Sequence, residues 1–391
     1  RLAQAPGWQL TVCYSSAWNR DVGWRMQPLD RSERPRTIIL DQKSPQLRRR
    51  LGSPEAAAAS LTWILARERP DYLVCYGYTL KPQTAALLWA LFTATPFAVI
   101  GDANIYCDTV GGLKRVIKRW WLRLVTRRAA ALITIGAANR VFWETYGARP
   151  EQLFEARFAI DNDTYADSAA AHKARAAALR ASLGLTDKVI FLFSGRLVER
   201  KNIDLIIRAQ QQLNDDRLAV VIAGDGDERA RLEALAGGDP RIVFTGSVDP
   251  DELPLYYAMA DVIVLPAAQE PWGLVINEAM ACGLAVIAHR HCGATLDLVD
   301  SDNGVALKTF SVEELAAAMK LLTHNDFLRV SMQERSREKI RVCSIDRAVQ
   351  GIIAAVESSF RDSGRDSGRN SGRVSGRVAG RVSAGVPGRR E

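Results

Sequence analysis

The sequence has few of the residues that hold metals or cross-link small domains. Its six cysteines are scattered and include no C-x-x-C pair, and its four histidines show no spacing typical of a metal site. Most of the cysteines lie in apolar runs, so we interpret them as buried thiols of a reducing compartment. This pattern argues against a disulfide framework and against a zinc site.

The sequence also lacks a long uninterrupted apolar run and a full dinucleotide fingerprint. Its longest apolar stretch, residues 84–101, is almost long enough to span a bilayer, but Pro96 and three threonines interrupt it. We expect a buried helix followed by a buried strand there. No complete G-x-G-x-x-G motif follows a predicted strand, which argues against an NAD- or FAD-dependent dehydrogenase.

Length and composition are those of a globular protein with two domains. The chain has 391 residues, of which 48% are hydrophobic and 25% are charged. Its net charge of +8 favours anionic partners such as nucleotide phosphates, acidic lipid headgroups or nucleic acid.

Short apolar runs alternate with helical patterns along most of the chain. The runs occupy residues 9–14, 37–40, 72–77, 96–101 and 131–136, and then 189–195, 218–224, 241–246, 262–266, 285–289 and 304–308. Continuous apolar strands joined by helices form parallel sheets that are covered on both faces. The sequence therefore predicts an α/β fold with two doubly wound, Rossmann-like domains facing a cleft.

The predicted domains have approximate limits. We place the N-terminal domain at 1–165 and the C-terminal domain at 166–345, and we expect 346–360 to form a helix that crosses back to the first domain. Residues 361–391 repeat Arg, a variable residue, Ser or Ala, and Gly. This segment has almost no apolar surface to bury, so we interpret it as a disordered basic tail. Because the tail supplies much of the positive charge, the case for a nucleic-acid partner is weak.

Two basic residues follow the first strand of the second domain. In the segment SGRLVERKN, Gly195 allows a sharp exit from the strand, and Arg196 and Lys201 precede the next helix. Cations beside a helix N-terminus form a phosphate site, because the free N–H groups and the helix dipole add to the side-chain charge. A solvated basic loop is the alternative, and the segment alone does not decide between them.

The loops after later strands add a glycine pair and two carboxylates. In AGDGDE, Gly224 and the glycine two residues later let the backbone approach a ligand, although a tight turn explains them equally well. In EPWGLVINEAMACG, Glu270 lies in the loop and Glu278 lies about one turn into the helix that begins near Leu274. Both carboxylates can then reach one cleft, where they would accept hydrogen bonds from sugar or ribose hydroxyls.

These blocks resemble those of a known family. GRLVERKNIDLII, VIAGDGDERARLEALA, RIVFTGSVDPDELPLYYAMADVIVLPAAQEPWGLVINEAMACGLAVIA and CGATLDLV occur in that order within about residues 186–310. They are similar to the nucleotide-sugar-binding half of retaining GT-B glycosyltransferases of the family 4 type. The E-x7-E pair of that family falls on Glu270 and Glu278. The resemblance implies a GT-B fold, a nucleoside-diphosphate sugar as donor, no metal and no further cofactor.

The resemblance also implies roles for single residues. Arg196 and Lys201 would hold the donor diphosphate and neutralise the departing nucleoside diphosphate. Glu270 would contact the donor sugar, and Glu278 would bind the ribose hydroxyls. Glu270, Arg196 and Lys201 would thus be the catalytic residues. The further donor-binding residues would be Gly195, Gly224, Trp272, Gly273 and Leu274, with the base near Val243 and Phe244.

The first domain resembles the family more weakly. Family members commonly have a Gly-rich loop after the first strand, whereas residues 14–24 contain glycine only at position 23. Many members also carry a His-Asp pair after the fourth strand, where this chain reads IGDANIY. Asp102 or Asn104 would contact the acceptor or the sugar, but capping of the strand end explains Asp102 equally well.

Residues 113–128, LKRVIKRWWLRLVTRR, predict a basic amphipathic helix. Apolar residues fall on one stripe, and cations fill most of the opposite side with no acidic residue among them. The stripe comprises Leu113, Val116, Ile117, Trp120, Trp121 and Leu124. We expect this stripe to pack on the domain's own sheet and the basic face to make a weak contact with an anionic membrane.

Together the observations predict a metal-independent, retaining hexosyltransferase. It would move a sugar from a UDP- or GDP-linked donor to a glycan or a lipid-linked acceptor, in envelope or exopolysaccharide synthesis. It would be cytoplasmic, or peripheral at the inner face of the cytoplasmic membrane. Two alternatives remain open, a GT-B-fold sugar-nucleotide epimerase and a degenerate transferase that serves as a binding scaffold.

Overall fold

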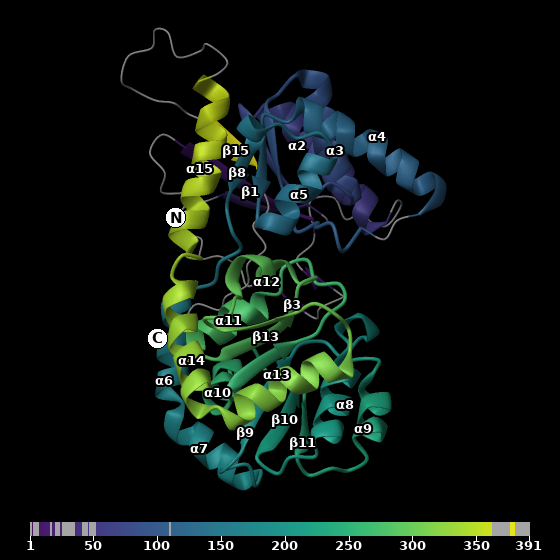
Figure 1. Ribbon diagram of the computed structural model, residues 1–391. Coiled ribbons are helices and arrows are strands. Elements are labelled where there is room, and N and C mark those ends of the chain that lie inside the picture. The colour runs from purple at the N-terminus through teal and green to yellow at the C-terminus, as the bar shows by residue number, and fades with distance from the viewer. Residues whose placement is uncertain are drawn as a thin grey trace.

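The computed structural model contains two domains, each built on a parallel β-sheet, one above the other in Figure 1. It describes residues 2, 8–15, 18–19, 24–25, 36–40, 46, 52–108, 111–361 and 376–379. The structure confirms the predicted α/β class with two doubly wound sheets.

The N-terminal sheet has the strand order β4-β1-β15-β5-β6-β7-β8, and its paired strands are parallel. Its strands from the first domain are β1 (Trp8–Tyr14), β4 (Arg36–Ile39), β5 (Tyr72–Tyr76), β6 (Phe97–Ile100), β7 (Ala131–Thr134) and β8 (Leu153–Glu155). The helices of this domain include α2 (Ser53–Glu68), α3 (Lys81–Thr93), α4 (Gly112–Arg128) and α5 (Ala137–Thr145). A short antiparallel pair, β2 (Trp18–Asn19) and β3 (Trp24–Arg25), lies outside this sheet. Strands β6 and β7 are buried throughout, as central strands covered on both faces must be.

Strand β15 (Gly376–Ala379) corrects our interpretation of the tail. It lies between β1 and β5 and pairs in parallel with both, so these four residues belong to the sheet and are not disordered. Backbone hydrogen bonds to two neighbours can hold such a strand even when its side chains have little apolar surface. Residues 362–375 and 380–391 lie outside the described residues.

The C-terminal sheet has the strand order β11-β10-β9-β12-β13-β14 and is also parallel. Its strands are β9 (Val189–Ser194), β10 (Leu218–Ala223), β11 (Ile242–Gly246), β12 (Val262–Leu265), β13 (Ala285–His289) and β14 (Gly304–Leu307). The helices between them include α8 (Ile203–Leu213), α9 (Arg229–Ala236), α10 (Leu253–Met259), α11 (Leu274–Cys282) and α12 (Gly293–Leu298).

The order of the C-terminal sheet places β9 beside β12, although about 70 residues separate them in the chain. From β9 the chain moves to β10 and β11 on one side, whereas β13 and β14 continue on the other side of β12. Such a reversal of strand order is a topological switch point, and the loops that leave the carboxyl ends of the two strands diverge there. The loops after β9 and β12 are those in which the sequence predicts the site.

The remaining helices complete the second domain and link it to the first. They are α6 (Asn162–Ala171), α7 (Lys173–Ser182), α13 (Val312–His324), α14 (Asp326–Ile340) and α15 (Ile345–Arg361). Helix α15 runs from the second domain to the first in Figure 1 and packs on β7 and β8. A Cβ atom on Gly351 would lie 1.9 Å from the carbonyl oxygen of Glu155, so only glycine allows the helix to lie this close. The two domains consequently share a continuous apolar core.

Helix α4 corrects our expectation for segment 113–128. Leu113, Ile117 and Trp120 are 75%, 61% and 73% exposed, so most of the predicted stripe faces solvent and does not pack on the sheet. The helix packs instead through Leu122 and Val125, which lie on its opposite side and are buried.

Among the described residues, no helix has the length and apolar character needed to cross a membrane.

Candidate functional site

Lys201 and Glu270 form an ion pair where the loops after β9 and β12 meet. Lys201 ends a short 3-10 helix and is only 8% exposed, and its ammonium contacts a carboxylate oxygen of Glu270. Arg200 lies 3.7 Å from the same oxygen and donates a hydrogen bond to the backbone oxygen of Gln269 at 2.6 Å. The structure therefore joins two of the three predicted catalytic residues and adds a second cation.

The loop that carries Glu270 is held by the start of α11 and by the loop after β13. Gly273 caps α11 with φ at +94°, and a Cβ atom there would lie 2.6 Å from Cys292 Sγ. The backbone N–H of Gly293 donates to the Glu270 carbonyl at 3.1 Å. Helix α11 begins at Leu274, and the first N–H groups of a helix lack partners within it. An anion beside Lys201 would thus also meet a helix N-terminus.

Glu278 has a different environment from Glu270. It accepts a hydrogen bond from the Tyr257 hydroxyl at 2.6 Å. Burial raises the pKa of its carboxyl above the usual range. A carboxylate has about four lone-pair sites, so the bond from Tyr257 leaves some acceptor capacity. The predicted contact with ribose hydroxyls stays a prediction.

The glycines of the two neighbouring loops have a packing explanation. A Cβ atom on Gly224, whose φ is +151°, would lie 1.9 Å from the carbonyl oxygen of Gly195. The amide of Gly195 in turn donates to the Ala223 carbonyl at 3.0 Å. Close contact between the loops after β9 and β10 therefore requires Gly224, whether or not a ligand approaches its backbone.

Trp272 and Val243 make contacts within the protein. The Trp272 side chain is buried and its indole N–H donates to Asn277 Oδ1 at 2.9 Å. Its carbonyl oxygen accepts the amide of Ala294 at 2.9 Å. The predicted contact of the Trp272 backbone with the donor stays a prediction. Val243 pairs with Val221 inside the ladder, and β11 continues to Gly246. The predicted base position at Val243 is therefore away from the strand end.

Asn104 links the two domains at the site. Its side chain is fully buried, and Nδ2 donates to the backbone oxygens of Glu270 at 3.2 Å and Pro271 at 3.1 Å. Its Oδ1 accepts the amides of Tyr106 and Cys107, both at 2.9 Å. We expected Asn104 to contact the acceptor or the sugar, but its amide group is used within the protein, so it positions the Glu270 loop instead.

Asp102 reaches the same site from the first domain. Its side chain is open to solvent at the end of β6, yet protein atoms surround it closely enough that burial raises the pKa of its carboxyl. The negative charge of Glu270 raises that pKa further. Asp102 is two residues from Asn104, which contacts the Glu270 loop, and its predicted contact with the acceptor or the sugar stays a prediction. Arg196 is exposed at the end of β9.

Sequence reasoning missed three residues around the site. Arg200 was passed over although it directly precedes Lys201, and a short helical turn brings both cations to Glu270. Tyr257 binds Glu278 from another helix. His291 stacks on Tyr106 with ring centroids 4.2 Å apart, across the two domains. No local pattern marks the last two, because each depends on a contact between segments distant in sequence.

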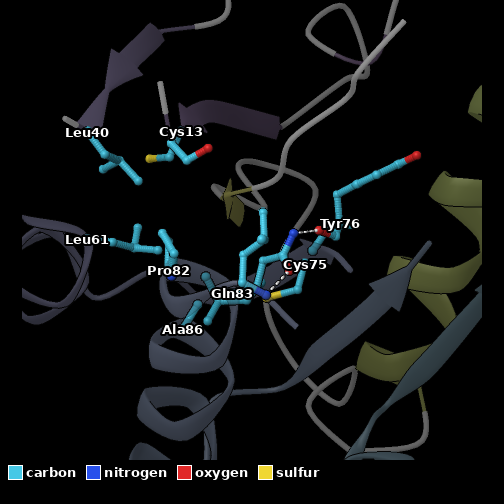
Figure 2. A pocket seen from close by; sticks show the side chains of 12 residues that line it. Cys13, Leu40, Leu61, Cys75, Tyr76, Pro82, Gln83 and Ala86 are labelled. Atoms are coloured by element: carbon cyan, nitrogen blue, oxygen red, sulfur yellow. Dashed lines mark hydrogen bonds between the residues drawn. The ribbon is translucent and has the colours of Figure 1, made fainter. Parts of the chain in front are cut away.

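A separate cavity lies in the first domain near the ends of β1 and β5. It has a volume of about 60 Å³ and is lined mainly by apolar side chains, including Leu40, Leu61 and Ala86. Figure 2 shows the Gln83 side chain pointing toward Tyr76. The side-chain amide of Gln83 donates a hydrogen bond to the carbonyl oxygen of Tyr76. The cavity has room for only a few water molecules, so it is no alternative sugar site.

Comparisons with known proteins agree with this geometry. Residues 176–339 match the family model described as glycosyl transferases group 1. The chain is 29% identical over 225 residues to an alpha-D-kanosaminyltransferase of Streptomyces kanamyceticus, a match that covers 56% of this chain and 58% of the relative. The chain spans about half the length, or less, of the curated relatives it matches.

Two solved structures share the fold over most of the chain. HepE of Anabaena, in complex with UDP and glucose, has a TM-score of 0.65 at 19% identity and covers 83% of this chain and 86% of its own. Sucrose-phosphate synthase of Thermosynechococcus elongatus has a TM-score of 0.70 at 18% identity and covers 92% of each chain. These likenesses confirm the GT-B fold.

Proposed function

We propose that the protein is a glycosyltransferase with a nucleoside-diphosphate sugar as donor, because residues 176–339 match the family model of group 1 glycosyl transferases. The observation that carries this proposal is the ion pair between Lys201 and Glu270, with Arg200 beside it, at the switch point of the C-terminal sheet. Ligands of open α/β sheets bind at such points.

The donor would lie across the loops that follow β9 and β12. Lys201 and Arg196 would bind the diphosphate together with the N-terminus of α11. Glu270 would accept hydrogen bonds from hydroxyls of the donor sugar, and Glu278 from those of the ribose. The complex of HepE with UDP and glucose supports a UDP-linked donor, and a GDP-linked donor is the alternative that the same site allows.

In the proposed reaction, an acceptor hydroxyl oxygen bonds to the anomeric carbon while the bond from that carbon to the diphosphate oxygen breaks. The hydroxyl proton passes to the departing diphosphate, whose growing charge Lys201 and Arg196 neutralise. These cations would do the electrostatic work of a metal ion. Attack on the face that the diphosphate leaves retains the anomeric configuration and needs no carboxylate nucleophile, unlike the route of retaining hydrolases.

The acceptor would approach from the first domain, where Asp102 lies near Glu270. We assign it to the glycans or lipid-linked glycans of envelope or exopolysaccharide synthesis, and the protein to the inner face of the cytoplasmic membrane. Helix α4 supports this location. The relatives named above are transferases or a synthase, which supports sugar transfer over epimerisation.

A ligand panel tests the donor proposal. The thermal midpoint of unfolding is measured with UDP, GDP, ADP and their sugar conjugates, because a ligand that binds only the native state raises this midpoint. We expect a shift with UDP or GDP that Lys201→Ala abolishes. Lys188→Ala is the matched control, since Lys188 lies just before β9, at the end opposite Lys201, and contacts the Asp216 backbone.

The same panel can contradict the proposal. A wild-type protein that responds to none of these nucleotides would not be a nucleotide-sugar transferase. A shift that survives Lys201→Ala but disappears in Lys188→Ala would place the nucleotide elsewhere. Retention is tested separately, by NMR of the product's anomeric proton once an acceptor is found.

A further inference from the structure

Helix α4 has apolar residues on two opposite sides, and only one side is used by the fold. The inner side packs on the N-terminal domain through Leu122 and Val125, which are both fully buried. The neighbouring Trp121 donates its indole N–H to the Tyr78 carbonyl at 3.4 Å. These contacts lie in the second half of the helix, and Figure 1 shows α4 reaching outward from the side of the domain.

The outer side carries an exposed apolar stripe. Its members follow helical spacing and are Leu113 (75% exposed), Val116 (50%), Ile117 (61%), Trp120 (73%) and Leu124 (42%). Residues at these intervals share one face of a helix. A contiguous exposed apolar patch marks an interaction surface far more often than scattered single side chains do.

Cations border this stripe, and the helix contains no acidic residue. The exposed members of this border are Lys114, Arg119, Arg123, Arg127 and Arg128. Lys118 is different, because it pairs with Asp108 at 2.7 Å and faces the ring of Phe142. The outer surface thus combines an apolar centre with a positive border.

We propose that α4 docks on an anionic phospholipid bilayer, lying in the plane of the interface. The apolar stripe enters the boundary between headgroups and acyl chains, with Trp120 at headgroup depth, while the bordering cations bind lipid phosphates. A second copy of the chain fits this surface poorly, because two such faces would oppose cation to cation. The phosphates of a nucleic acid would pair with the bordering cations but would leave the apolar stripe uncovered.

Docking would also place the membrane beside the acceptor side of the site. The loop from β6 to α4 carries Asp102 and Asn104, and Asn104 contacts the Glu270 loop. This consequence rests on the proposed function, whereas docking itself does not. Vesicle binding and nucleotide binding are measured separately, so either can fail while the other holds.

Co-sedimentation of the full chain with vesicles tests the proposal. We expect binding to phosphatidylcholine vesicles that contain phosphatidylglycerol, little binding to phosphatidylcholine alone, and weakening with added salt. Ile117→Ser combined with Trp120→Ser should weaken binding by about tenfold or more, and Arg119→Gln combined with Arg123→Gln by about tenfold. All four side chains are exposed, so the fold should tolerate these changes.

Phe327→Ser provides the matched control, because Phe327 is 87% exposed on α14 of the other domain. Its binding to vesicles should equal that of the wild type, and every variant should keep the nucleotide-induced thermal shift. Absence of binding to anionic vesicles at low salt would overturn the proposal. Unchanged binding by the Ile117/Trp120 variant would also overturn it, as would a dimer in solution that this variant dissociates without any vesicle binding.

Discussion

Glu270 and Glu278 lie eight positions apart but belong to different environments. Glu270 meets two cations, Lys201 and Arg200, at the junction of the domains. Glu278 accepts a hydrogen bond from the Tyr257 hydroxyl, and burial raises the pKa of its carboxyl. Neighbouring cations stabilise the ionised form of a carboxylate, whereas burial makes the ionised form less stable. We therefore expect Glu270 to act mainly on turnover, and Glu278 mainly on nucleotide affinity and on stability.

Replacement of Glu270 should have the largest effect on turnover. Glu270→Gln removes the charge that orients the donor sugar, so we expect turnover to fall by about a hundredfold or more. Binding of the nucleoside diphosphate should persist, because Lys201 loses its carboxylate partner and remains available to phosphate. Single-turnover kinetics and the thermal shift with UDP measure the two effects. Equal losses of turnover and UDP binding would contradict the separate roles.

Replacement of Asn104 should lower turnover through Glu270 and leave donor binding nearly unchanged. Asn104→Ala removes both hydrogen bonds to the Glu270 loop, and a misplaced catalytic group costs between about tenfold and about a hundredfold in turnover. The thermal shift with UDP should be nearly unchanged, and Asn104→Ser should recover part of the loss if its hydroxyl reaches a loop carbonyl. A lost UDP shift with normal turnover would show that Asn104 does not act through Glu270.

Glu278→Gln should lower the affinity for UDP and leave turnover nearly unchanged, the reverse of what we expect for Glu270→Gln. If the carboxylate binds ribose hydroxyls, the neutral amide should weaken UDP affinity by about tenfold, while turnover at saturating donor stays near the wild-type value. Titration calorimetry with UDP measures the affinity. Tyr257→Phe, which removes one hydroxyl partner of Glu278, is the companion variant. An unchanged affinity in Glu278→Gln would make the ribose assignment wrong.

The smallest expected effect is a change in the pH dependence of stability. Because burial raises the pKa of Glu278 in the folded protein, the folded state binds its proton more tightly than the unfolded state does. Its contribution to stability is therefore full below the usual pKa of 4.5 and declines as pH rises through the folded value. As pH rises from 4.5 through the folded pKa, the thermal midpoint of Glu278→Gln should therefore rise relative to that of the wild type. A difference that is the same at every pH would contradict this assignment.

The second domain could be predicted from its sequence in some detail. Its strands are continuous apolar runs, its loops carry glycines, and the loops that carry Lys201 and Glu270 follow strands β9 and β12, which the sheet order makes neighbours. The sequence singles out Gly224 and Gly273, and both have a positive φ in the structure. The partner of Gly224, however, is the backbone of Gly195 and not a ligand, because sequence shows that a position needs glycine but not what approaches it.

The first domain shows where sequence reasoning fails. The period of α4 identified the residues that share a face but not that this face points away from the protein. Asn104 was read as a ligand contact because it follows a strand end, yet partners from both domains bury it. Strand β15 was missed because its repeat has no apolar pattern, and its neighbours β1 and β5 hold it through the backbone.

The two parallel sheets, the position of the cations and carboxylates in strand-end loops, and the apolar stripe of α4 can all be predicted from the sequence. These features depend on spacing within short segments, which local backbone geometry converts directly into faces and ends. The pairing of Lys201 with Glu270, the hydrogen bond from Tyr257 to Glu278 and the exposure of the apolar stripe of α4 depend on the packing of distant segments. Each of these contacts depends on which distant segment packs beside a side chain, and the spacing of residues within one segment cannot predict that.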